Sequence, residues 1–203
     1  MSDPSGLLTV VVPGTFYNEN TWSTQGGAKN FISSVGKTFG ETPVVMNDKT
    51  TWSGKNTQEA RQSAATSLAK MINDHKFADG EKLNIVGHSH GGNVGILASE
   101  MTDKQVDNLV TLGTPNRLMY QPNKNKIENH INVYSRFDLA QKAAEIGDPV
   151  GIVGNNDSRK FSGAENIGVG LRAGIFPRGS HTNLWQNSSV WSLVNTKADS
   201  LKK

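Results

Sequence analysis

The sequence predicts an α/β fold in which a mainly parallel central sheet is flanked by helices, giving three αβα layers. Runs of β-branched residues such as 7–12 are continuous rather than alternating, which is typical of strands buried on both faces. Stretches with helical spacing alternate with these runs. The chain has 203 residues, which corresponds to one domain at about 100–200 residues per domain. We therefore expect residues 1–203 to form a single domain.

The first strand and the longest helix are predicted from local signals. The strand over residues 7–12 ends at Pro13-Gly14, a turn signal. Between Asn56 and Asp74 the apolar residues recur at helical spacing. Asn56, followed three residues later by Glu59, resembles a capping box and indicates where this helix begins.

The remaining elements are predicted in order along the chain. The expected strands cover residues 82–86, 108–112, 130–134 and, more weakly, 166–171. The expected helices cover residues 94–101 and 190–198. Segments rich in Asn, Gly, Ser, Thr and Pro are predicted to be loops, and they are residues 17–30, 43–56, 115–129 and 139–162.

Composition and charge exclude several classes of function. The chain has no cysteine, which excludes thiolate metal sites, a cysteine nucleophile and disulfides. Its net charge is +3 without a run of like charges, so we expect no nucleic-acid partner. The apolar run at residues 7–12 is much too short to span a bilayer and lacks a positively charged flank. We therefore expect a soluble protein with no signal peptide or transmembrane segment.

The motif Gly87-His88-Ser89-His90-Gly91 lies between a predicted strand and a predicted helix. A G-x-S-x-G pattern in this context holds a serine in a strained turn and exposes its Oγ. The helix that follows offers unpaired N–H groups to a developing oxyanion. A glycine-rich phosphate-binding turn is the alternative, but neither G-x-G-x-x-G nor G-K-[ST] follows. The motif therefore predicts a nucleophilic serine at position 89.

A serine nucleophile requires a base, and the chain has five histidines. His75 lies at the polar end of a helix, whereas His88 and His90 flank the nucleophile and are expected to point away from its Oγ. His130 precedes every good acid candidate, although the expected chain order is serine, acid, histidine. We therefore predict that His181, in a loop just before the final helix, is the base.

Three aspartates are candidates for the acid that orients the base. Asp138 follows Tyr134 by four residues, at the carboxyl end of a predicted strand, where sites of open α/β sheets lie. Asp148 is the rival, although its Gly-Asp-Pro context is explained by a turn, and Asp157 is a weaker third candidate. Asp138 is the predicted acid, and the choice between Asp138 and Asp148 stays open at this point.

Two backbone N–H groups are predicted to form an oxyanion hole. One belongs to His90, at the start of the helix after the nucleophile. The other is expected from the loop after the first strand, where Gly14 permits a tight turn and Thr15 follows it. Phe16 is the neighbouring candidate for this second donor.

Together these residues resemble the α/β-hydrolase superfamily, and within it the serine lipases and esterases. The resemblance extends from about Leu7 to Trp191 and includes Leu112-Gly-Thr-Pro115. A closer similarity is carried by Thr51-Trp-Ser-Gly-Lys-Asn56 with Arg61, and by Gly163-Ala-Glu-Asn-Ile167. These segments resemble lipase-like domains of bacterial polymorphic toxins and interbacterial effectors.

The resemblance implies a catalytic domain that hydrolyses carboxylic esters through an acyl-enzyme intermediate. Ser89 would attack, His181 would take its proton, Asp138 would orient the imidazole, and Thr15 and His90 would bind the oxyanion. It implies no metal and no organic cofactor. A thioesterase or acyltransferase with the same triad and a small soluble esterase remain alternatives.

Apolar residues in the predicted loops favour a lipid or phospholipid substrate. They are Phe16, Tyr17, Trp22, Trp52, Leu118-Met-Tyr120 and Ile175-Phe176. Scattered cations would allow a peripheral contact with an anionic membrane, and they are Lys124, Lys126, Arg172 and Arg178. If the chain is a toxin domain, we expect delivery by a bacterial secretion system and an immunity protein as a partner.

Overall fold

The computed structural model describes residues 7–15, 26–47, 50, 52–138, 159–171 and 178–201. Strands and helices alternate along these residues. The strands are β1 (Leu7–Val12), β2 (Val44–Val45), β3 (Lys82–His88), β4 (Val106–Leu112), β5 (Ile127–Ser135) and β6 (Glu165–Val169). The helices are α2 (Gly26–Phe39), α3 (Gln58–Asp74), α4 (His90–Ser99), α6 (Arg178–Gln186) and α7 (Ser188–Leu201).

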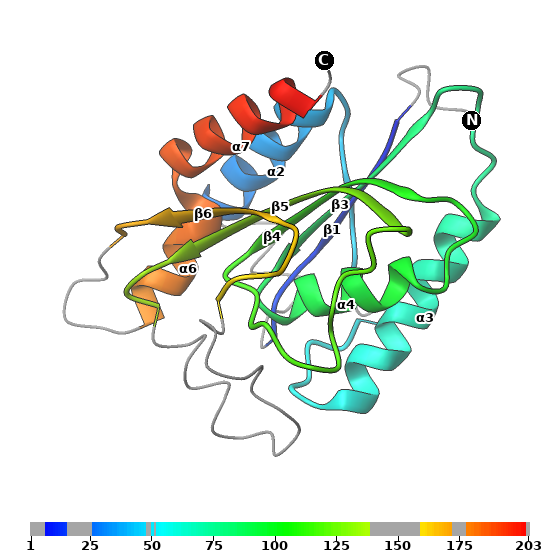
Figure 1. Ribbon diagram of the computed structural model, residues 1–203, viewed down its shortest axis with the longest axis horizontal. Coiled ribbons are helices and arrows are strands. Elements are labelled where there is room, and N and C mark those ends of the chain that lie inside the picture. The colour runs from blue at the N-terminus through cyan, green and yellow to red at the C-terminus, as the bar shows by residue number, and fades with distance from the viewer. Residues whose placement is uncertain are drawn as a thin grey trace.

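All strands of the described sheet are parallel, and their order is β2-β1-β3-β4-β5-β6. The carboxyl ends of β3, β4 and β5 therefore meet at one edge, where ligands bind in open α/β sheets. Helices cover both faces, with α3 and α4 on one side and α2, α6 and α7 on the other (Figure 1). The predicted three-layer αβα architecture is confirmed.

Each face of the sheet has its own hydrophobic core. Val10 of β1 packs with Leu68 of α3 and Ile85 of β3 on one face. Val11 of β1 packs with Phe31 of α2 on the other. Because neighbouring residues of one strand point into different cores, the strands consist of continuous apolar runs, as the sequence predicted.

A row of hydrogen-bonded polar side chains, called the ladder here, crosses four strands of the sheet. Thr9, Asn84, Asn108 and Asn129 lie side by side on four adjacent strands. Asn84 Nδ2 donates to Thr9 Oγ1 at 3.1 Å and Asn108 Nδ2 donates to Asn84 Oδ1 at 2.7 Å. Asn129 Nδ2 donates to Asn108 Oδ1 at 3.3 Å. A shift of register by one residue would move each amide to the other face, so the ladder helps to fix the pairing.

Helices α2, α3 and α6 differ from the sequence-based expectation, and α6 is described with the site below. Strand β2 lies within the segment 43–56, which was predicted to be a loop. Helix α2 was not predicted, because the segment 17–30 that includes its start is rich in glycine and asparagine. Its buried residues Ala28, Phe31 and Val35 nevertheless have helical spacing. Helix α3 begins after Thr57, whose side chain accepts a hydrogen bond from the backbone N–H of Ala60. The predicted cap at Asn56 was therefore wrong by one residue.

None of the helices in the described part of the chain is long and apolar enough to cross a membrane.

Candidate active site

Ser89 lies in a strained turn between β3 and α4. Its backbone angles are φ 52° and ψ −130°, and no other non-glycine residue of the described ranges has a positive φ. Such a conformation costs about 1–3 kcal/mol and persists only where the surroundings impose it. Ser89 N–H donates to Leu112 O at 2.8 Å, which ties the turn to the end of β4. This is the geometry that the G-x-S-x-G motif predicts.

Glycines allow this turn to pack without a gap. A Cβ on Gly87 would overlap the backbone of Gly92, and a Cβ on Gly91 would overlap the carbonyl oxygen of Val12. A Cβ on Gly92 would overlap the Thr114 hydroxyl. The motif glycines and Gly92 are therefore required because α4 begins against the ends of β1, β3 and β4.

His181 and Asp138 are hydrogen-bonded, with 2.6 Å between His181 Nδ1 and Asp138 Oδ2. A carboxylate only accepts hydrogen bonds, so Nδ1–H is the donor and, in a neutral imidazole, Nε2 carries no proton. The Asp138 side chain is fully buried and the His181 side chain is 15% exposed. The sequence left the choice of acid open between Asp138 and Asp148, and the structure places Asp138 beside His181. Asp148 and Asp157 lie outside the described residues.

The three predicted triad residues all lie at the carboxyl edge of the sheet. Ser89 follows β3, Asp138 follows β5, and the imidazole of His181 lies over Gly113 at the end of β4. A Cβ on Gly113 would be 3.1 Å from His181 Nδ1, and Gly113 N–H donates to Val133 O at 2.9 Å. Successive strand ends thus bring together residues that are far apart in the sequence.

His181 lies on an element that the sequence analysis placed differently. It was predicted in a loop before the final helix, but it lies within α6 (Arg178–Gln186). Two residues of the same helix, Leu184 and Trp185, are buried in the core. The imidazole is therefore held by a packed helix rather than by a loop.

The loop after β1 passes directly over Ser89. A Cβ on Gly14 would be 2.9 Å from Ser89 Cβ, so this backbone approaches as closely as a glycine permits. Trp52 Nε1 donates to Pro13 O at 2.8 Å and fixes the start of the loop. Thr15, the predicted second oxyanion donor, is the next residue and is half-buried. The alternative donor, Phe16, lies outside the described residues.

His90, the residue after Ser89, has its side chain buried beside cationic groups. Burial, together with the nearby charges of Arg61, Arg117 and His181, lowers the pKa of His90 to about 3. Its Nδ1 accepts a hydrogen bond from Asn93 Nδ2 at 3.2 Å. The His90 side chain is therefore neutral and stays inside the protein. Only the backbone N–H of His90 is left to take part in the site.

A buried polar cluster beside the site was missed by the sequence analysis. Arg61 Nε donates to the Tyr120 hydroxyl at 2.8 Å and Arg61 Nη1 donates to Asn56 Oδ1 at 3.0 Å. The guanidinium also lies 5.5 Å from the centre of the Tyr120 ring. An arginine on the buried face of a helix whose other buried residues are apolar was the signal that could have indicated this cluster.

Trp52 and Tyr120 were predicted to line an acyl-chain cleft, but both are buried in the core below the loops. Leu118 is 56% exposed and Phe137 is 45% exposed. Met119, also predicted to line the cleft, is half-buried and packs against the same core. The remaining predicted cleft residues, Phe16, Tyr17, Trp22, Ile175 and Phe176, lie outside the described residues.

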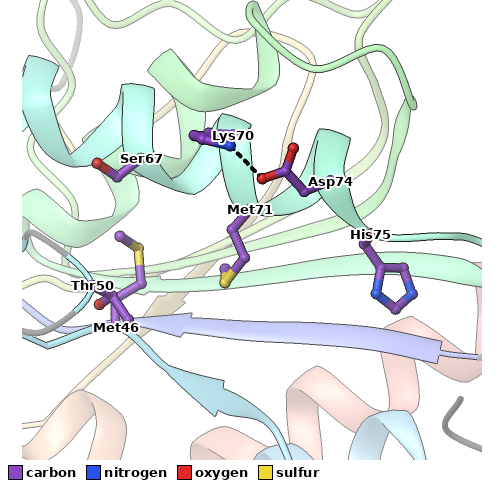
Figure 2. Close-up of a pocket in the computed structure, with 7 residues that line it drawn as sticks. All are labelled: Met46, Thr50, Ser67, Lys70, Met71, Asp74 and His75. Atoms are coloured by element: carbon purple, nitrogen blue, oxygen red, sulfur yellow. Dashed lines mark hydrogen bonds and ion pairs between the residues drawn. The ribbon is translucent and has the colours of Figure 1, made fainter. Parts of the chain in front are cut away.

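A groove of about 480 Å³ lies elsewhere, along α3 (Figure 2). Its lining includes Met46, Met71 and His75, and an ion pair of 2.5 Å joins Lys70 and Asp74 along its rim. No predicted catalytic residue contributes to it. Within the ranges that the structure describes, no three His, Asp or Glu side chains are grouped so that they could hold a metal ion.

Comparison with known proteins identifies the family. The sequence matches the family described as alpha/beta hydrolase over residues 25–146. The chain belongs to the alpha/beta hydrolase family. It is therefore a hydrolase by family, and the parallel six-stranded sheet flanked by helices is the alpha/beta hydrolase fold. No relative was found among curated proteins.

Solved structures share this alpha/beta hydrolase fold at low sequence identity. Mouse alpha/beta hydrolase domain-containing protein 10 is 11% identical, with a TM-score of 0.58 over 99% of this chain and 91% of that one. An a/b serine hydrolase without a lid from Xanthomonas campestris is 11% identical, with a TM-score of 0.55 over 97% and 80%. A YdeN-like hydrolase from Pectobacterium atrosepticum is 12% identical, with a TM-score of 0.54 over 96% and 92%.

Proposed function

We propose that this alpha/beta hydrolase is a serine hydrolase of carboxylic esters, with Ser89, His181 and Asp138 as its catalytic triad. The observation that carries the proposal is the 2.6 Å bond between His181 and Asp138 at the sheet edge where the strained turn presents Ser89. A hydroxyl is a weak nucleophile, and this arrangement supplies both a base and the group that orients it.

The reaction proceeds in two halves. Ser89 Oγ attacks the ester carbonyl as His181 Nε2 takes its proton, and a tetrahedral oxyanion forms. The imidazolium then protonates the leaving alcohol, which gives an acyl-enzyme and restores neutral His181. Water, deprotonated by His181, releases the acid and regenerates Ser89. Asp138 accepts from Nδ1–H throughout, which keeps Nε2 free for the proton and stabilises the imidazolium.

The oxyanion is stabilised by the N–H groups of His90 and Thr15. The N–H of His90 is the first of α4, where the helix dipole favours negative charge. Each such donor is typically worth about 10²–10³ in rate. The close approach of Gly14 to Ser89 supports the position of the second donor.

We propose an apolar acyl ester, from a lipid or phospholipid, as the substrate class. The support is the exposure of Leu118 after β4 and of Phe137, which directly precedes Asp138. Large exposed apolar side chains on loops at the strand ends favour a substrate with a hydrocarbon chain over a small polar ester.

A peripheral contact with an anionic membrane would bring the enzyme to such a substrate. Lys124 is exposed, whereas Lys126 is half-buried and donates to Thr102 O at 3.0 Å. Arg172 and the side chain of Arg178 lie outside the described residues. Lys124 is therefore the cation of the predicted set that supports this contact.

The substrate proposal is tested by incubating the protein with phospholipid vesicles and with short- and long-chain esters. Products are analysed by mass spectrometry beside Ser89→Ala. Release of fatty acid and lysolipid by the wild type alone supports a phospholipase. Turnover of short esters alone contradicts the lipid substrate and indicates a small soluble esterase. Hydrolysis of acyl-CoA indicates a thioesterase, and acyl transfer to an added alcohol indicates an acyltransferase.

An antibacterial effector role, with an immunity protein as the cognate partner, is a separate proposal. It rests on the resemblance of residues 51–56 and 163–167 to toxin domains. Expression directed to the periplasm of a bacterium is expected to slow growth, and Ser89→Ala is expected to restore it. Normal growth with an active enzyme in the periplasm contradicts this role.

A further inference from the structure

His88, the residue before Ser89, is enclosed by the groups that build the site. Its side chain is buried at the end of β3. The centre of its ring lies 4.7 Å from that of His181 and 6.1 Å from that of Trp185. On another side, a Cβ on Gly14 would be 3.0 Å from His88 Nδ1. The ring therefore fills the space between the loop over Ser89 and the helix that carries His181.

His88 also forms a polar contact with α6. Its Nε2 is 3.3 Å from the backbone oxygen of His181. A carbonyl oxygen can only accept, so Nε2 carries the proton and donates it to this bond. His88 thus contacts both the ring and the backbone of the proposed base.

The charge state of His88 suits this contact. Burial lowers the pKa of His88 well below its usual value, and the charge of the neighbouring His181 lowers it further, although the bond to the His181 backbone opposes both effects. His88 is therefore neutral at physiological pH. It does not compete with His181 for the proton of Ser89, and it places no second positive charge beside the imidazolium.

We propose that His88 is a positioning residue, which holds His181 in register with Ser89 through its Nε2–H bond and its ring contact. This inference rests on the proposed serine-hydrolase function. The bond to Asp138 holds one edge of the imidazole, but the ring can still tilt about this bond. His88 packs against the ring and anchors the backbone beneath it, which limits the tilt. A misplacement of about 1 Å at such a group can lower the rate by about 10²-fold.

Three substitutions separate the two contacts. His88→Phe keeps a flat ring and removes the donor, whereas His88→Gln keeps an amide N–H at a similar reach and removes the ring. His88→Asn is the matched control, because its amide is one methylene shorter and does not reach the His181 oxygen.

We expect His88→Phe and His88→Asn to lower kcat on a short ester by about 10–100-fold while KM changes less than threefold. His88→Gln is expected to recover most of the kcat that His88→Asn loses. A fluorophosphonate label should report the same ranking without a natural substrate. A kcat within twofold of the wild type in both His88→Phe and His88→Asn overturns the proposal. If His88→Phe fails to fold, equal rates for the Gln and Asn variants overturn it.

A spectroscopic measurement keeps this test separate from the proposed function. The proton on His181 Nδ1, shared with Asp138, is observed by NMR on histidine labelled with ¹⁵N. We expect its resonance to shift or broaden in His88→Asn and to stay near the wild-type position in His88→Gln. Identical spectra for all variants overturn the positioning role. A wild type that neither labels nor turns over any ester contradicts the hydrolase proposal instead, and the spectra still decide the role of His88.

Discussion

Acidification should destabilise this protein strongly, because buried histidines are held neutral in the fold. Burial lowers the pKa of His130 to about 3, and burial with nearby charges lowers the pKa of His90 to about 3. Both side chains have ordinary pKa values near 6.5 once the chain unfolds. The unfolded chain therefore binds more protons below pH 6.5, and folding stability falls with pH.

The size of the effect follows from these pKa values. Stability from each histidine is fully present above pH 6.5 and is lost as the pH falls toward 3, at about 1.4 kcal/mol per pH unit. At pH 5 the contribution of each histidine to the free energy of unfolding has fallen by about 2 kcal/mol, so the protein has lost about 4 kcal/mol of stability from the two together. Because domains are commonly stable by about 5–15 kcal/mol, this is a large fraction of the total. His88 contributes in the same direction.

Urea denaturation at pH 8, 6.5 and 5 measures this loss, with His130→Gln as the comparison. His130 lies on β5, where its Nε2 is 2.9 Å from Thr111 Oγ1 and its ring is 5.2 Å from that of Phe161. The variant is expected to be less stable than the wild type at pH 8 but to lose about 2 kcal/mol less between pH 8 and pH 5. An equal loss in both proteins would refute the assignment of His130 as a buried neutral group.

Three further substitutions test other parts of the structure. Asp138→Asn is expected to lower kcat by about 10⁴-fold through the wrong tautomer of His181, and a loss below tenfold by steady-state kinetics contradicts its role. Trp52→Phe is expected to cost about 1 kcal/mol in thermal unfolding and to lower kcat with little change in KM, because Pro13 O loses its donor; an unchanged kcat counts against the loop assignment. Asn84→Ala is expected to cost about 2–5 kcal/mol by urea denaturation, because two buried partners lose their bonds, and an unchanged midpoint contradicts the ladder.

The architecture could be predicted because the strands can be recognised from their own residues, without knowledge of their neighbours. Each inner strand is buried on both faces, which imposes continuous apolar runs such as Leu7–Val12 and marks them in the sequence. Helix α2 escaped prediction because Gly26 and Gly36 and its neighbouring polar residues resemble a loop locally. The helical spacing of its buried residues Ala28, Phe31 and Val35 becomes recognisable only when the sheet face against which they pack is known.

The candidate site was predictable in part. Gly87–Gly91 indicates a strained turn by itself, since the glycines are required by contacts within a few residues of Ser89 and with the end of β1. The partnership of Asp138 with His181 depends instead on strand order, because only adjacent β3, β4 and β5 bring these positions together. The contact between Arg61 and Tyr120 was missed for the same reason, since the two residues are distant in sequence.

The central claim, that Ser89 is a nucleophile activated by His181 and Asp138, is tested most directly by fluorophosphonate labelling followed by mass spectrometry of the modified peptide. The wild type is expected to carry one label on Ser89, His181→Ala is expected to label far more slowly, and Ser89→Ala is expected to carry none. Labelling of Ser89→Ala at the wild-type rate, or the absence of label in a folded wild type, would contradict the assignment.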